Sequence, residues 1–244
     1  MIKRISLTLL ALLLLAGPAL ARMIVVAQDA TWPPMEFMSP DKEIVGFDTD
    51  YMRAVAKEAG LEVTFKNVAW DGIFAGLEAG QYDAICSSVT ITEDRKRAMD
   101  FSTPYFMVRQ VLVAQKSSTF MGLEDMKGKA VGAQIGSTGY FAAKKVNGVA
   151  VKPYDAIELA MEDLYNGRID GVVCDDPIAV QYALTKPEYA EKLMIAAVLE
   201  TSDEQYGIAV KKGNKEVLDL INTGIAAVQA KGIDKELLRK WIGK

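Results

Sequence analysis

Segments with the apolar patterns of strands and of helices alternate along this chain, and the alternation begins twice. In the first half, strand-like runs at 23–27, 61–66 and 83–86 are separated by helix-like segments at 47–59 and 71–79. Successive parallel strands need a crossover connection, and an intervening helix supplies one. This order predicts an α/β fold built on a parallel sheet.

The alternation restarts near residue 110. Strands are predicted at 110–114, 130–134, 149–153, 171–174, 193–197 and 206–210, and helices end near 145 and 166 and span 175–184, 215–230 and 234–242. The buried strands at 83–86 and 170–174 both deliver polar groups at their carboxyl ends. Open α/β sheets bind ligands at that edge. Two sheets with a site between their facing strand ends fit this layout.

The N-terminus has the three parts of a secretory signal peptide. Lys3 and Arg4 precede an apolar core at 5–16, and the small residues at 19–21 form an A-x-A cleavage site. We therefore predict a signal peptide over 1–21, a mature chain that starts at Arg22, and a periplasmic location. An uncleaved membrane anchor is the alternative, but the apolar core is short for a span. No later run approaches that length, so the mature chain is not expected to cross a membrane.

Charge and composition exclude several classes of function. The net charge is −4, and removal of Lys3 and Arg4 makes the mature chain more acidic, which argues against a nucleic-acid partner. The chain has no histidine, so histidine triads and histidine-ligated zinc are excluded. No metal and no cofactor are expected. Cys86 and Cys174 lie in apolar runs and are predicted to be separate buried thiols, with one disulfide as the alternative.

A polar stretch from Ser87 to Arg95 follows the third strand-like run. It holds the hydroxyls of Ser87, Ser88 and Thr90, a predicted helix start at Thr92 and the guanidinium of Arg95. Backbone N–H groups at a helix start favour an anion, and arginine can hold both oxygens of a carboxylate. The stretch therefore suits a carboxylate. A strand end with a helix cap and a surface arginine is the structural alternative.

Seven short motifs of this chain resemble those of a known family, and this resemblance favours the carboxylate site over the structural alternative. They are 29–37 (DATWPPMEF), 45–50 (VGFDTD), 70–72 (WDG), 87–95 (SSVTITEDR), 100–105 (DFSTPY), 136–139 (GSTG) and 175–177 (DDP). With these motifs in this order, essentially the whole mature chain resembles the periplasmic solute-binding proteins of polar amino-acid ABC transporters. These proteins are family 3 of the extracellular solute-binding proteins.

The resemblance implies a two-lobed periplasmic binding protein fold, with two Rossmann-like lobes joined by two hinge strands. Carried over, lobe 1 comprises 22–109 and 206–244, and lobe 2 comprises 110–205. The hinge crossings fall near 108–110 and 203–205. The lobes of such a fold close around a ligand.

The resemblance also implies how the shared part of an amino acid is held. In the family, the ligand's α-carboxylate is held at positions that match Arg95, Thr90 and Ser88 of this chain. The Ser137–Thr138 loop, at a helix start, matches a further contact to the same group. The α-ammonium is held by a carboxylate of lobe 2 that matches Asp175, with help from Ser88. The two charged groups are thus held chiefly by opposite lobes, so a molecule that carries both favours the closed state.

The side-chain pocket is predicted from Asp29, Trp32 and Trp70, with Gln134 ahead of the loop as a further contact. Two indoles beside a carboxylate suit a planar cation, because guanidinium groups stack on aromatic faces and pair with carboxylates. Arginine is therefore favoured, with lysine, ornithine or histidine as alternatives and glutamine as the main rival. Core or lip packing is the alternative role of Trp32 and Trp70.

Several acids are interpreted as structural. Glu36, Asp48 and Asp50 are placed in this group. Asp48 is expected to cap the helix that begins at Thr49. Caps are likewise predicted at Asp155, as part of a capping box, and at Asp176, which would leave Asp175 free for a ligand.

The resulting prediction is a non-enzymatic, monomeric protein that binds a polar L-amino acid and delivers it to an inner-membrane ABC permease. One rival is a cyclohexadienyl or arogenate dehydratase-like enzyme on the same fold, but the chain has no histidine and apolar residues follow 175–177. A second rival is a sensor-type ligand-binding domain on this fold, although no signalling segment follows residue 241.

Overall fold

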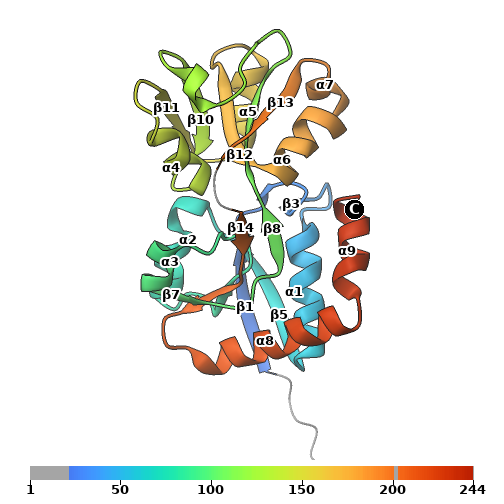
Figure 1. The fold of residues 1–244 in the computed structure, drawn as a ribbon. Coiled ribbons are helices and arrows are strands. Elements are labelled where there is room, and N and C mark those ends of the chain that lie inside the picture. Colours follow the sequence, from blue (N-terminus) through green and yellow to red (C-terminus); the bar gives the residue numbers. More distant parts are fainter. Residues whose placement is uncertain (1–21, 201–202, 244) are drawn as a thin grey trace, which may run out of the picture.

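A computed structural model describes residues 22–200 and 203–243 of the chain. The predicted signal peptide, residues 1–21, lies outside the described residues. The described chain forms two α/β lobes, which lie one above the other in Figure 1. The predicted two-lobed fold is therefore confirmed.

The first lobe is built on a five-stranded sheet. The strand order is β5 (Leu61–Asn67), β1 (Arg22–Gln28), β6 (Ala84–Ile85), β15 (Ala209–Lys211) and β7 (Met99–Phe101). β1 pairs in parallel with β5 and β6, as the alternating pattern predicts, whereas β15 pairs antiparallel with β6 and β7. β15 thus returns the chain to the first lobe after the second is complete.

Five helices and a small antiparallel sheet complete the first lobe. The helices are α1 (Phe47–Glu58), α2 (Trp70–Glu78), α3 (Glu93–Ala98), α8 (Lys215–Ala230) and α9 (Ile233–Trp241). The small sheet comprises β2 (Thr31–Trp32), β3 (Glu36–Met38) and β4 (Ile44–Val45). In α1, Tyr51 and Val55 lie one helical turn apart and both are fully buried, as their spacing predicts.

The second lobe has its own five-stranded sheet. Its order is β11 (Ala150–Tyr154), β10 (Ala130–Gln134), β12 (Gly171–Asp175), β9 (Gln110–Gln115) and β13 (Leu193–Val198). Its helices are η1 (Leu123–Met126), α4 (Thr138–Lys144), α5 (Ile157–Tyr165), α6 (Asp176–Val180), η2 (Gln181–Thr185) and α7 (Pro187–Ala190). β10 is parallel to β11 and β12, and β9 is antiparallel to β12 and β13. The carboxyl ends of β10 and β12 carry Gln134 and Asp175.

Two strands cross between the lobes. β8 (Phe106–Val108) and β14 (Glu204–Tyr206) run antiparallel, and Glu204 pairs with Val108. Figure 1 shows both strands at the junction of the upper and lower lobes. The predicted strand at 206–210 is thus divided into β14 and β15, which belong to different sheets. These short paired strands leave the lobes linked by little regular structure.

Close approach of helices fixes one side of the first lobe. A Cβ atom at Gly224 in α8 would lie 2.3 Å from the backbone oxygen of Val55 in α1, so only glycine permits this spacing. Asp50 in α1 accepts hydrogen bonds from Lys240 Nζ (2.7 Å) and Trp241 Nε1 (2.9 Å) of α9. α1 is therefore held by both α8 and α9.

Three predicted helix caps are wrong. α1 begins at Phe47 after Gly46, so Asp48 lies inside its first turn and not at its cap. α5 follows Ala156 with no side-chain cap, and Asp155 lies outside it. α6 starts at Asp176 itself. The cap position before α6 belongs to Asp175, whose side chain makes no capping bond, so Asp175 is indeed not used as a cap.

The two cysteines are separate buried thiols, as predicted. Among residues 22–200 and 203–243, no helix combines the length and apolar character needed to cross a bilayer.

Candidate ligand-binding site

A small cavity lies between the lobes. It is lined by all eleven predicted ligand contacts and by one further residue, Glu36; the eleven are Asp29, Trp32, Trp70, Ser87, Ser88, Thr90, Arg95, Gln134, Ser137, Thr138 and Asp175. Its volume of about 20 Å³ is close to the space that one water molecule needs. An amino acid therefore does not fit in this cavity unless its walls move apart.

Arg95 forms one wall of this cavity. Its Nη1 donates to Thr90 O (2.8 Å) and its Nη2 donates to Gly136 O of the second lobe (3.2 Å). The guanidinium carbon lies 5.4 Å from the ring centre of Trp70 and 5.1 Å from that of Phe74, within cation–π range. Burial lowers the pKa of Arg95 to about 10, so the group remains a cation at neutral pH.

This cation has no direct counter-ion in the described part of the chain. None of the ion pairs found there includes Arg95. The local fold explains its position, because Thr92 caps α3 by accepting from the Arg95 N–H (3.2 Å), as predicted. A half-buried guanidinium without a carboxylate partner suits an incoming anion with two oxygens.

Buried acids lie behind the serine hydroxyls. Ser87 Oγ donates to Glu36 Oε1 (2.8 Å) and accepts from the Asp29 N–H (2.9 Å). The N–H of Ser88 donates to Asp48 Oδ2 (2.5 Å), and Ser88 Oγ lies 3.2 Å from the same atom. Burial and the neighbouring Asp48 raise the pKa of Glu36 well above its usual range, and burial raises that of Asp48 to about 6. The serine hydroxyl protons are thus directed away from a ligand.

Asp175 stands at the carboxyl end of β12, on the second lobe. Tyr206 Oη and Gln110 Nε2 both donate to its carboxylate. Burial raises its pKa to about 7, against the opposing effect of the Tyr206 bond. A cationic group in the cavity would favour the ionised form of Asp175.

The second-lobe loop contributes Ser137 and Thr138. Ser137 caps α4 by accepting from the Tyr140 N–H (3.0 Å), so its oxygen has a structural role. Thr138 Oγ1 donates to Glu204 Oε2 (2.8 Å).

Asp29 lines the cavity together with the two indoles. It accepts from Gln134 Nε2 (2.9 Å) and from Thr31 Oγ1 (3.0 Å), and burial raises its pKa to about 6. The indole N–H groups of Trp32 and Trp70 are buried without a hydrogen-bond partner in the described structure. These two donors face no protein acceptor, which is costly unless a ligand or water satisfies them.

Comparisons with known proteins identify the family of the chain. Residues 24–244 match the model of the bacterial extracellular solute-binding proteins, family 3. The chain belongs to this family. ABC transporter arginine-binding protein 1 of Escherichia coli (strain K12) is 34% identical over 231 residues, which cover 92% of this chain and 93% of that protein. The family predicted from the motifs is confirmed.

Two solved structures in the same fold extend the comparison. An ancestral arginine-binding protein bound to glutamine is 41% identical, with a TM-score of 0.84 over 91% of this chain and 98% of that one. The arginine-, lysine-, histidine-binding protein ArtJ from the thermophilic bacterium Geobacillus stearothermophilus is 36% identical, with a TM-score of 0.84 over 91% of this chain and 96% of that one.

Four residues at or behind the cavity were not predicted as site residues. The sequence indicates a structural role for Glu36 and places Gln110, Glu204 and Tyr206 only at or beside the hinge crossings. Glu36 lies inside a motif that carried the resemblance, so a signal for it existed. The other three reach the site only through long-range hydrogen bonds: Gln110 donates to Glu204, and Tyr206 donates to Asp175. Among residues 22–200 and 203–243, no group of three His, Cys, Asp or Glu side chains could hold a metal ion.

Proposed function

We propose that this chain binds a polar L-amino acid, with arginine or another basic amino acid favoured and glutamine next, and delivers it to an inner-membrane ABC permease. The observation that carries the proposal is the pairing, in one cavity, of a half-buried guanidinium that forms no ion pair in the described residues, Arg95, with a buried carboxylate, Asp175. An α-carboxylate and an α-ammonium match these two charges.

The side-chain preference rests on Asp29, Trp32 and Gln134. Asp29 can pair with a guanidinium or ammonium, and Gln134 can serve either an amide or a cation through its oxygen. Trp70 is already within cation–π distance of Arg95, so Trp32 is the indole more available to a ligand cation. Relatives named for arginine, lysine and histidine, and one arginine-binding protein bound to glutamine, support the same range of ligands.

Ligand capture would proceed by hinge closure. We propose that residues 22–109 with 206–244 move as one unit and residues 110–205 as the other. The paired crossing strands β8 and β14 support a hinge at these positions. Binding would pull the units together because each holds one charged end of the ligand. Small-angle scattering tests this step, because the radius of gyration should fall when the ligand is added.

Export and release from the membrane belong to the proposal as well. The mature protein would start at Arg22, act as a monomer in the periplasm and perform no catalysis. N-terminal sequencing of the periplasmic fraction should begin at Arg22, and incubation with prephenate or arogenate should yield no product.

The central test is calorimetric titration of the mature chain with each of the twenty amino acids. Arginine should bind most tightly, followed by other basic amino acids and then glutamine. At a thousandfold excess over Kd, the ligand should stabilise the fold by about 4 kcal/mol. A preference for acidic or aliphatic amino acids would refute the pocket assignment, and no binding at all would refute the function.

A further inference from the structure

A glutamate of the hinge strand joins the two lobes through a single oxygen atom. Glu204 Oε2 accepts hydrogen bonds from Thr90 Oγ1 of the first lobe (3.2 Å) and from Thr138 Oγ1 of the second (2.8 Å). It also accepts from Gln110 Nε2 (3.2 Å). The side chain is half-buried and makes no ion pair with a lysine or arginine in the described residues. Glu204 is not among the residues that line the cavity, although Thr90 and Thr138 are.

This contact determines which way the two threonine hydroxyls face. A hydroxyl has one proton to donate, and an ionised carboxylate can only accept. Thr90 and Thr138 must therefore both donate to Glu204 and cannot donate to a ligand carboxylate at the same time. Thr138 Oγ1 already accepts from Gln110 Nε2 (3.0 Å), whereas Thr90 Oγ1 keeps lone pairs for a donor in the cavity.

We propose that Glu204 is a positioning residue that holds the Thr90 hydroxyl as a hydrogen-bond acceptor toward the ligand's ammonium group. The inference rests on the proposed function and revises one part of it. The Thr90 hydroxyl, which the sequence assigned to the α-carboxylate, accepts from the ammonium instead, whereas the Thr138 hydroxyl is occupied by Glu204 and Gln110. Arg95 and backbone N–H groups then hold the carboxylate.

The charge of Glu204 acts in the same direction. Gln110 Nε2 donates to both Glu204 and Asp175, so a second carboxylate lies behind Asp175, outside the cavity lining. A ligand that has the carboxylate but lacks the α-ammonium would place no positive charge near these two negative groups. Glu204 should therefore raise selectivity for amino acids over their des-amino analogues.

The test compares the amino acid that binds tightest, expected to be arginine, with its des-amino analogue, 5-guanidinopentanoate. Titrations would use the wild type, Glu204→Gln and Glu204→Met. The glutamine can still accept the hydroxyl protons through its amide oxygen, whereas methionine of similar size cannot. The preference for arginine should fall by about tenfold or more in Glu204→Met, the size expected for a lost hydrogen bond to a charged group. It should fall less in Glu204→Gln.

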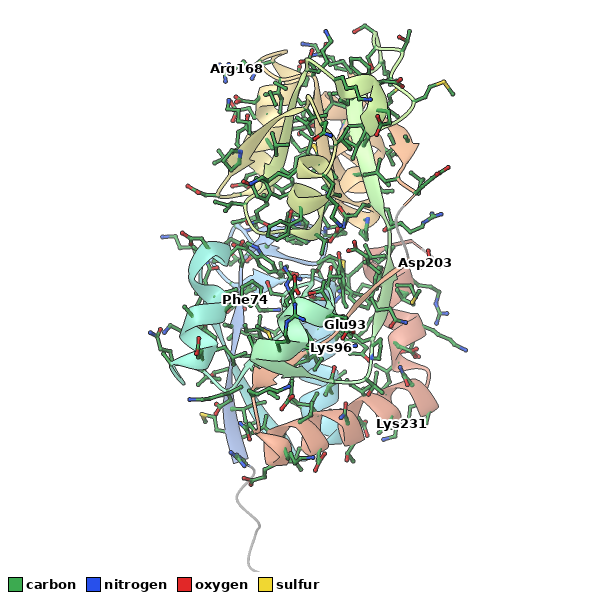
Figure 2. The ribbon with its side chains drawn as sticks, turned by 60° about the vertical axis from the view of Figure 1, so that its left-hand side comes forward. Phe74, Glu93, Lys96, Arg168, Asp203 and Lys231 are labelled. Atoms are coloured by element: carbon green, nitrogen blue, oxygen red, sulfur yellow. The ribbon has the colours of Figure 1, made fainter. Side chains whose placement is uncertain are left out.

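A matched control lies one residue away. Figure 2 shows Asp203 at the level between the lobes, and its side chain is exposed. Asp203→Asn removes the same charge from the same segment and should leave the preference unchanged. In a Thr90→Val background, Glu204→Met should change the preference less than it does in the wild type, because the hydroxyl that Glu204 positions is gone and only the effect of its charge remains.

The outcomes separate the two proposals. If wild type binds no amino acid, the proposed function fails. If wild type binds arginine but Glu204→Met weakens both ligands by the same factor, Glu204 is a hinge contact only and the inference is overturned. Should Glu204→Met fail to fold, Glu204→Gln with Thr90→Val decides, because an additive double mutant would also overturn it.

Discussion

Gln134 Nε2 donates a hydrogen bond of 2.9 Å to Asp29 Oδ2, although the two residues are 105 positions apart. Gln134 ends β10 of the second lobe, and Asp29 follows β1 of the first. The bond therefore joins the lobes at the end of the cavity assigned to the ligand's side chain. A cationic side chain would have to share Asp29 with Gln134 or displace it. Asp29 thus offers a direct test of ligand class.

Asp29→Asn should weaken arginine binding selectively. Loss of a hydrogen-bonded charge pair should raise the Kd for arginine by about 10–100-fold. The Kd for glutamine should change by less than about threefold, because an amide needs no carboxylate partner. Calorimetric titration at pH 7.5 measures both values. Equal losses of affinity for arginine and glutamine would mean that Asp29 supports the structure of the site and does not contact the ligand's side chain.

Arginine affinity should depend on pH because of the same carboxyl group. Burial raises the pKa of Asp29 to about 6, and a bound guanidinium favours its ionised form. At pH 5 the free protein must release a proton before it binds, so the Kd should be at least about tenfold weaker than at pH 7.5. Asp29→Asn should reduce this dependence, and Asp175 would account for what remains. Tighter binding at pH 5 would contradict the assignment.

Arg95→Ala should abolish binding of every amino acid in the panel. Arg95 is the cation of the cavity, and its loss should raise Kd by about 100-fold or more for basic and neutral ligands alike. Arg95→Lys keeps the charge but not the planar fork, so it should recover only part of the affinity. Arg97→Ala is the matched control, since Arg97 lies in the same helix, is exposed and pairs with Asp94. A binding loss in the control would point to damage of α3 instead.

Local patterns predicted most of the elements and the cap at Thr92. The reason is physical: the Thr92 hydroxyl and the Arg95 N–H are three residues apart, so their bond depends on nothing distant. Local patterns alone could not predict which residues line the cavity. The motifs from the family resemblance contain ten of the eleven predicted lining residues, and Gln134 was placed only by its position ahead of the 136–139 loop. No spacing rule alone would have joined Asp29 to Gln134.

The errors arose where distant partners competed with a local motif. Asp48 is of a residue type that often caps helices. Its carboxylate instead accepts hydrogen bonds from the Ser88 N–H, 40 residues away, and from Tyr105 Oη, 57 residues away. Glu204 was visible only as part of a crossing segment, because its partner Thr90 is 114 residues away. Such contacts follow from the packing of two lobes and leave no periodic trace in the sequence.

The ligand-free protein should be more stable at pH 5 than at pH 7.5. Folding raises the pKa of Asp29 and Asp48 to about 6 and that of Asp175 to about 7. Each of these carboxyl groups stabilises the folded state fully below its unfolded-state pKa of about 4. This stabilisation is lost as the pH rises through the pKa of the group in the folded state. The chain has no histidine to titrate in this range. Urea unfolding should show a difference of at least about 1 kcal/mol.

The buried acid Glu36 provides the matched variant for this pH effect. Glu36→Gln mimics the protonated form and can still accept from Ser87 Oγ. It should therefore lower the difference in unfolding free energy between pH 5 and pH 7.5. A wild-type protein that gains stability toward pH 7.5 would show that these carboxyl groups are ionised in the folded state.

Gly46→Ala should destabilise the fold and the site together. Gly46 precedes α1 with a φ of 134°, and a Cβ there would lie 2.2 Å from Met35 O and 2.9 Å from the Glu36 nitrogen. To relieve this clash, the backbone that carries Glu36 would have to move. The unfolding free energy should fall by about 3 kcal/mol or more. Gly60→Ala is the control, because its φ of 69° is also positive but its Cβ would meet nothing within 4 Å. That change should cost about 1 kcal/mol. Urea unfolding measures both, and equal losses would show that the left-handed backbone, not the contact with Met35, dominates at Gly46.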